Sequence, residues 1–104
     1  MPFANPKELG IHFRKHGHEV GARTAAEYEQ MADAFMLGAM NTDTQECLRG
    51  NRVKRCRLDF VTTHFGVALA ATPVMLTFYP PRPDTIARYG GILGYFQHEC
   101  GRMD

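Results

Sequence analysis

Apolar side chains recur at two different spacings along the chain, and the change falls close to position 41. Before it they repeat every three or four residues, as on one face of a helix, and the clearest stripe is Tyr28, Met31, Ala32 and Phe35. Beyond it they alternate with small or polar residues, as in half-buried strands. The chain therefore predicts an N-terminal helical part followed by a β-sheet.

Helix-start signals predict two helices in the first part. Asn5 and Pro6 combine an N-cap residue with a proline at the first helical position, which favours a helix over 6–17. Thr24 followed by Glu27 has the spacing of a capping box, because the hydroxyl and the carboxylate each accept from an unpaired amide at the helix start. A second helix is therefore expected to begin there and to end shortly before position 41.

The alternating part predicts four strands that form one antiparallel sheet. They are expected over 44–49, 52–58, 64–70 and 74–79, with a short helix over 93–100 after them. The run Pro80-Pro81-Arg82-Pro83 ends the sheet, because proline has no N–H to donate to a ladder. The pattern favours an α+β domain with the N-terminal helices packed on one face of a four-stranded antiparallel sheet.

The alternation also predicts which face the helices cover. That face is expected to carry the large apolar side chains Phe65, Val67, Leu69, Leu76 and Phe78. The other face is expected to carry the small or polar residues His64, Gly66, Ala68, Ala70, Thr77 and Tyr79. A floor of small residues with a polar rim suits an open substrate groove, and a merely solvated face is the alternative.

Length and charge limit the function classes. At 104 residues the chain is expected to form one domain over 1–104, and no apolar run is long enough to span a membrane. The net charge of +1 is not that of a general nucleic-acid binder. Positive charge is nevertheless concentrated at Arg49, Arg52, Lys54, Arg55 and Arg57. Such a run either contacts a phosphate backbone or forms a solvated edge strand.

The three cysteines, at positions 47, 56 and 100, show no CxxC spacing, which argues against a zinc knuckle or a thioredoxin-type site. A two-residue turn at Gly50-Asn51 sets Cys47 opposite Lys54 and only diagonal to Cys56, a poor geometry for a disulfide. Free thiols and a reducing cytosol are therefore expected.

The most informative polar group lies on the first helix. His12, Lys15, His16 and Glu19 share one face at helical spacing. Imidazoles transfer protons near neutral pH, and an ammonium group stabilises phosphate charge. Metal-free RNA cleavage needs these functions: a base for the 2′-OH, an acid for the leaving 5′-oxygen and cations for the phosphate. Surface or core-boundary histidines are the alternative.

A zinc site is a second interpretation of the same histidines. His12 and His16 have the spacing of two ligands on a zinc-binding helix. However, Phe13 stands where a zincin motif has its glutamate, and no other Cys or His pair completes the ligand set. We therefore expect neither a metal nor another cofactor.

Further candidates lie on the predicted strands. Arg55 and Arg57 share a face, where either one contacts a phosphate or Arg55 pairs with Glu46 on the neighbouring strand. Hydroxyl and imidazole groups suited to phosphate contact are found at Thr63, His64, Thr77 and Tyr79. Thr63 and His64 otherwise simply organise a turn.

Several spaced motifs together resemble a known family. The first half carries His12-Phe-x-Lys15-His16-Gly17-x-Glu19-x-Gly21, then Thr24-x-x-Glu27-Tyr28 and Ala32-x-x-Phe35. The second half carries Glu46-Cys47-x-Arg49, Val53-x-Arg55, Thr63-x-Phe65-Gly66-Val67 and Leu76-Thr77-Phe78-Tyr79-x-Pro81. Over roughly 9–98 the chain resembles the C-terminal nuclease modules of bacterial polymorphic and contact-dependent inhibition toxins, which also occur in phage head-associated proteins.

The resemblance implies a BECR-type ribonuclease fold, the group of barnase, EndoU, the colicin ribonucleases and RelE. It implies a toxin endoribonuclease that cleaves RNA, often tRNA, without a metal and binds a dedicated immunity protein, as a monomer or as a heterodimer with it. The module is expected to arrive as part of a larger secreted toxin and to act in the cytoplasm of the target bacterium. The alternatives are a non-enzymatic phage-associated or protein-binding module and a different, metal-dependent enzyme on a related fold.

The residue pattern and the resemblance together assign the expected roles, and the family's polar motif positions fall on His12, Lys15, His16, Thr63, Thr77 and Tyr79. The expected catalytic residues are His12, Lys15, His16, Thr77 and Tyr79. The expected substrate-binding residues are Arg55, Arg57, Thr63 and His64. The chain departs from the family pattern at Val20, where the family usually has phenylalanine, and at His64, where an acidic or polar residue is common. The turn at 71–73 also lacks the usual Asp-Gly.

Overall fold

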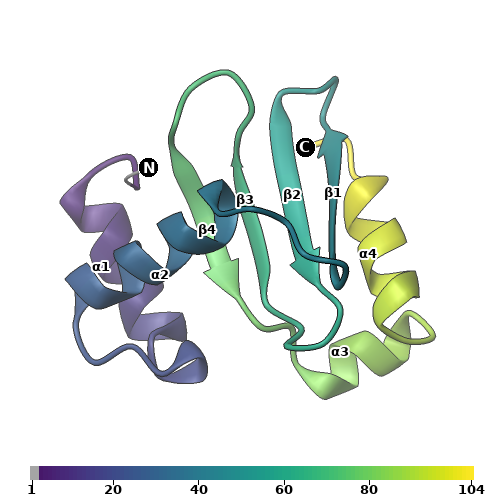
Figure 1. Ribbon diagram of the computed structural model, residues 1–104, viewed down its shortest axis with the longest axis horizontal. Helices are drawn as coiled ribbons and strands as arrows, with labels where there is room; N and C mark the ends of the chain where they lie inside the picture. The colour runs from purple at the N-terminus through teal and green to yellow at the C-terminus, as the bar shows by residue number, and fades with distance from the viewer. Residues whose placement is uncertain (1–2) are drawn as a thin grey trace.

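The computed structural model describes residues 3–104, and its helices and strands follow the predicted order (Figure 1). The N-terminal part contains α1 (Pro6–His16), the 3₁₀ helix η1 (His18–Val20) and α2 (Ala25–Leu37). The sheet consists of β1 (Thr44–Arg49), β2 (Lys54–Asp59), β3 (Phe65–Leu69) and β4 (Met75–Tyr79). The chain continues into α3 (Pro83–Arg88) and α4 (Ile92–Cys100). Within the described residues no helix has both the length and the apolar character needed to cross a bilayer.

The sheet is an antiparallel meander in the order β1-β2-β3-β4. α1 and α2 pack on one of its faces, so the predicted α+β fold with N-terminal helices on one side of a four-stranded sheet is confirmed. The C-terminal helix α4 covers the opposite face, and both helical layers are visible beside the sheet in Figure 1. The short helix α3 was not predicted.

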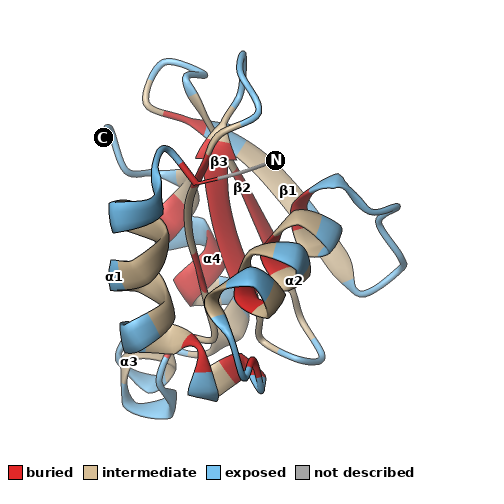
Figure 2. Ribbon diagram, turned by 90° about the vertical axis from the view of Figure 1, so that its left-hand side faces the viewer, coloured by how far each residue is buried: buried red, intermediate tan, exposed pale blue. Residues whose placement is uncertain are grey.

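Each face of the sheet has its own apolar core, which makes the central strands the most deeply buried part of the chain (Figure 2). The core between the sheet and α1 and α2 includes Tyr28 and Met36 from α2 and Phe78 from β4. The core between the sheet and α4 includes Phe65 and Val67 from β3 and Tyr95 from α4. The domain is therefore three layers thick, with the sheet in the middle.

The prediction of an open floor of small residues is wrong. Gly66 and Ala68 lie under α2 rather than facing solvent. A Cβ at Gly66 would come within 2.7 Å of the Met36 sulfur, so the small residues permit close approach of the helix. Phe78 pairs with Gly66, so it lies under α2 and not beside Val67. The register shift between Val67 and Ala68, where Leu76 is the extra residue on β4, brings Met75 into the same core.

The turn between β1 and β2 is longer than predicted. Gly50, Asn51 and Arg52 all have positive φ, and the N–H of Val53 donates to the Gly50 carbonyl. The turn takes in residues 52 and 53, so the partner of each β1 residue moves by two positions. Cys47 therefore lies directly opposite Cys56 and not opposite Lys54.

The prediction of three free thiols is also wrong. Cys47 on β1 forms a disulfide with Cys100 at the end of α4, with a Cα–Cα distance of 6.0 Å, while Cys56 stays a buried free thiol. The bond ties α4 to the edge of the sheet. Because Cys47 and Cys100 are paired, the cysteines no longer indicate a reducing cytosol.

Candidate functional site

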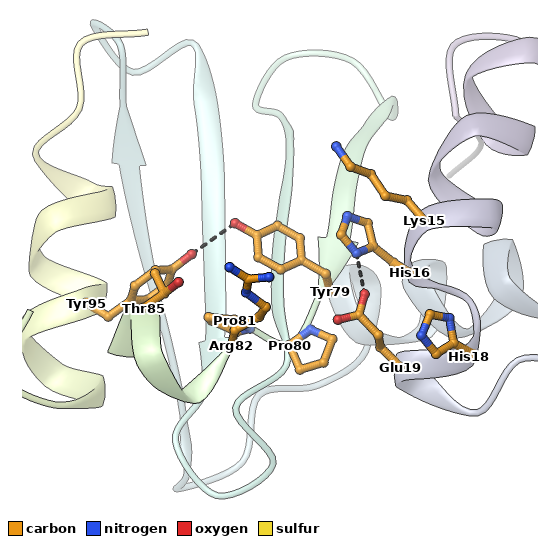
Figure 3. A pocket seen from close by; sticks show the side chains of 10 residues that line it. All are labelled: Lys15, His16, His18, Glu19, Tyr79, Pro80, Pro81, Arg82, Thr85 and Tyr95. Carbon is orange, nitrogen blue, oxygen red and sulfur yellow. Dashed lines mark hydrogen bonds and ion pairs between the residues drawn. The ribbon is translucent and has the colours of Figure 1, made fainter. Parts of the chain in front are cut away.

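A cleft of about 470 Å³ lies where the end of α1 meets the end of β4 (Figure 3). The N-terminal layer contributes Lys15, His16, His18 and Glu19 to its lining. The segment from the end of β4 into α3 contributes Tyr79, Pro80, Pro81, Arg82 and Thr85, and α4 contributes Tyr95. The cleft therefore joins the two helical layers at the exposed edge of the sheet, where β4 is the last strand.

A histidine–glutamate pair forms one wall of the cleft. α1 ends at His16, and Gly17 leads into the turn of η1, which brings Glu19 back toward the end of the helix. His16 Nδ1 lies 2.5 Å from Glu19 Oε1. A carboxylate only accepts hydrogen bonds, so Nδ1 carries the proton and Nε2 is the atom left for a ligand. The pair thus fixes both the tautomer and the direction of the imidazole.

The aromatic ring of Tyr79 supports the same imidazole. The two rings stack with centroids 4.9 Å apart and an interplanar angle of 24°. The other end of Tyr79 is held by Tyr95, because the two hydroxyl oxygens lie 2.9 Å apart. Burial raises the pKa of Tyr79, so its hydroxyl stays neutral at physiological pH. Tyr79 places its ring beside His16, while its hydroxyl is engaged with that of Tyr95.

The charges around the cleft are mainly positive. Lys15 and His16 both project from α1 on the side of β4 (Figure 3). Arg82 lies across from them, its side chain 75% exposed and loosely paired with Asp84 at 3.6 Å. Among the described residues that line the cleft, Glu19 is the single acid, and it is engaged with His16. Such a site favours a ligand that carries phosphate.

His12 lies outside the cleft, although it is only one turn from His16. Its ring stacks on Phe3 at 5.2 Å, and its Nε2 lies 3.9 Å from Glu8. Burial, with the nearby His16, lowers the pKa of His12, while Glu8 acts in the opposite direction. The structure therefore gives His12 a place in the boundary of the helical core and not at the site that was predicted for it.

Arg55 and Arg57 are engaged with the protein itself. Arg57 donates to the carbonyl oxygens of Phe35 and Gly38 at 2.8 and 2.7 Å, and to Glu46 at 2.7 Å. Arg55 donates to Met36 O at 3.0 Å and to Glu46 at 3.4 Å. These are the carbonyl groups that the last turn of α2 leaves unpaired. Both arginines thus cap α2, and neither lines the cleft.

The remaining predicted residues also lie elsewhere. Thr63 is in the β2–β3 turn with a positive φ of 63°, and its N–H donates to the Asp59 carbonyl. The ring of His64 meets Phe78 edge-on at 5.5 Å, and burial lowers its pKa. Thr77 pairs with Val67 in the middle of β4 and does not reach the cleft lining.

The structure therefore brings together Lys15, His16 and Tyr79 out of the predicted residues. It adds His18, Glu19, Arg82, Thr85 and Tyr95 to the site. His18 and Glu19 belong to the histidine-rich segment that the sequence already marks. Arg82 stands among prolines that predict only the end of the sheet, and Tyr95 has no local signal because its partner lies 16 residues away.

Within the described part of the chain, metal ligands are gathered neither at this site nor elsewhere. Across residues 3–104 no group of three or more histidine, cysteine, aspartate or glutamate side chains is placed to hold a metal ion. His12 and His16 have ring centroids 6.4 Å apart. No model of a known protein family matches the sequence, and no curated protein matches it either.

Proposed function

We propose that this protein is an endoribonuclease that cleaves RNA by transesterification through the ribose 2′-hydroxyl. The observation that carries the proposal is the oriented imidazole of His16, fixed by Glu19 and Tyr79 in a cleft that Lys15 and Arg82 make positive. Together these residues supply a proton-transfer group and cations for a phosphodiester.

The chemistry needs two proton transfers and no external co-reactant. A base removes the 2′-OH proton, the 2′-oxygen attacks phosphorus, and the bond to the 5′-oxygen breaks as that oxygen receives a proton. The products are a 2′,3′-cyclic phosphate and a 5′-OH. His16 Nε2 performs one of these transfers, and His18 is the second imidazole that lines the cleft. Lys15 and Arg82 stabilise the charge on the phosphate oxygens.

The biological setting belongs to the same proposal and is supported by the resemblance in sequence. The protein acts as the toxin module of a larger secreted protein, reaches the cytoplasm of a target bacterium and cleaves RNA there, with tRNA as the preferred substrate. A dedicated immunity protein blocks the cleft in the producing cell. A cleft that is open and positive fits both a folded RNA and an acidic inhibitor.

The test is to incubate the purified protein with tRNA and with total RNA in the presence of EDTA and to map the RNA ends. We expect cleavage that leaves 2′,3′-cyclic phosphate and 5′-OH ends, and growth arrest when the protein is expressed in bacteria. Ends with 3′-OH and 5′-phosphate would contradict the mechanism. Intact RNA at micromolar protein, without growth arrest, would favour a binding module instead.

A further inference from the structure

We propose that Tyr95 is a positioning residue of the cleft, which holds Tyr79 in the place where its ring supports His16. The effect on rate that follows rests on the proposed ribonuclease function. The effect on the geometry of the cleft does not, and it is measured separately.

The contacts of Tyr95 suit such a role. It is 3% exposed, and its hydroxyl oxygen lies 2.9 Å from that of Tyr79. Its ring meets Phe65 edge-on at 5.7 Å, and Phe65 meets Tyr79 edge-on at 5.8 Å. Burial raises the pKa of Tyr95, so both phenols stay neutral and one donates to the other. Tyr79 is thus held at its hydroxyl by Tyr95 and along its ring by Phe65.

The helix that carries Tyr95 is fixed to the sheet at its C-terminal end. Cys100 is bonded to Cys47 on β1. One residue earlier, Glu99 accepts from Arg49 at the end of β1, with Arg49 Nη1 3.1 Å from both Glu99 Oε1 and the Glu99 carbonyl oxygen. A side chain on such an anchored helix keeps its position better than one on a loop.

The contacts form one line from α1 to α4, visible in Figure 3. Glu19 holds His16, His16 stacks on Tyr79, and Tyr79 bonds to Tyr95. The imidazole is therefore located by the C-terminal layer as well as by its own helix. Without the Tyr95 hydroxyl, Tyr79 keeps only the contact of its ring with Phe65, so we expect the ring to shift and the stack on His16 to loosen while the Glu19 contact remains.

The test compares Tyr95→Phe with Tyr89→Phe as the matched control. The ring centroids of Tyr89 and Tyr95 lie 6.0 Å apart, and Tyr89 stacks on His98. Proton NMR of the His16 ring reports the stack through its ring-current shift, whether or not the protein cleaves RNA. We expect Tyr95→Phe to move the His16 signals and to lower kcat by roughly fivefold, with KM nearly unchanged, because one net hydrogen bond is lost. Tyr89→Phe is expected to change neither value.

Tyr79→Phe removes the same hydrogen bond from its other end, and the double variant completes a cycle. We expect the same shift of the His16 signals in each single variant and no further shift in the double variant. If Tyr95→Phe does not fold, Tyr79→Phe carries the test. His16 signals that stay at their wild-type positions in a folded variant lacking the bond would overturn the proposal. If the variants show the shift but the wild-type protein does not cleave RNA, only the proposed function is overturned.

Discussion

Two pairs of basic residues in this protein have very different surroundings in the structure. Lys15 and Arg82 line the cleft, and the Arg82 side chain is 75% exposed. Arg55 and Arg57 on β2 face the end of α2, and the Arg57 side chain is 8% exposed. The donors of the first group are available to a ligand, whereas those of the second already bind carbonyl oxygens and Glu46.

The difference shows that positive charge alone does not identify a phosphate site. A guanidinium group satisfies an unpaired helix carbonyl as readily as it satisfies a phosphate oxygen. On β2 the nearest acceptors are those of α2, because α2 ends above the strand. Removing residues of the β2 group should therefore affect folding, and removing residues of the cleft group should affect substrate.

The largest effect on stability is expected for Arg57→Ala. The change leaves the carbonyls of Phe35 and Gly38 without their donor and Glu46 with only Arg55, so we expect a loss of about 3 kcal/mol in the free energy of unfolding. Urea unfolding followed by circular dichroism measures it. Arg82→Ala is the control, with a change below about 0.5 kcal/mol. Equal losses in the two variants would remove the distinction between the groups.

A smaller effect, on rate, is expected for Glu19→Gln. The amide keeps the size of the side chain but removes the carboxylate that fixes the tautomer and the direction of the His16 imidazole. We expect kcat to fall by about 10- to 100-fold with little change in KM, as for other residues that orient a catalytic histidine. Glu27→Gln on α2, which pairs only with exposed Arg23, is the control for general loss of a carboxylate. A change in KM alone would show that Glu19 acts on binding.

Lys15→Ala and Arg82→Ala are expected to have moderate effects that fall on substrate binding. Each removes one cation from the cleft, so we expect KM to rise by about 5- to 10-fold and the dependence of KM on salt to weaken. The free energy of unfolding should stay within about 0.5 kcal/mol of the wild type. Steady-state kinetics at several salt concentrations give both results. An unchanged KM in both variants would place the phosphate elsewhere.

The smallest effect is a pH dependence of stability that arises outside the cleft. Burial lowers the pKa of both His12 and His64 below the ordinary value of 6.5, so the unfolded chain binds more protons than the folded one as the pH falls below that value. Stability is therefore fully present above pH 6.5 and decreases with acidification. Replacing both residues with glutamine should flatten this part of the curve in thermal unfolding. If stability depends on pH in the variant as steeply as in the wild type, other groups cause the pH dependence.

The fold was largely predictable, because periodicity and capping are local signals. The Asn5 side chain accepts from the Glu8 amide, and Thr24 accepts from the Glu27 amide, as their spacing predicts. The four strands lie within two residues of their predicted bounds. What failed depends on long-range geometry: the β1–β2 turn and the irregular pairing of β3 with β4 set the register, and the register decides which face each residue joins.

The site was predictable only in its N-terminal half. Lys15, His16 and Glu19 are close in sequence, so their spacing already predicts that they lie near one another, as they do in the structure. His12 fits the same spacing but turns toward Phe3, and nothing in the spacing shows that a residue near the N-terminus covers it. Tyr95 and Cys100 depend on where α4 packs, which requires the three-dimensional arrangement of both layers.

The most direct measurement compares two histidines one turn apart on the same helix. His16→Ala and His12→Ala are assayed against the same RNA at a pH where both variants are folded. Since only His16 reaches the cleft, we predict that its loss lowers kcat/KM by about 100-fold or more, while the loss of His12 changes it by less than about threefold. Equal losses in both variants, or full cleavage by His16→Ala, would contradict the assignment of this cleft as the active site.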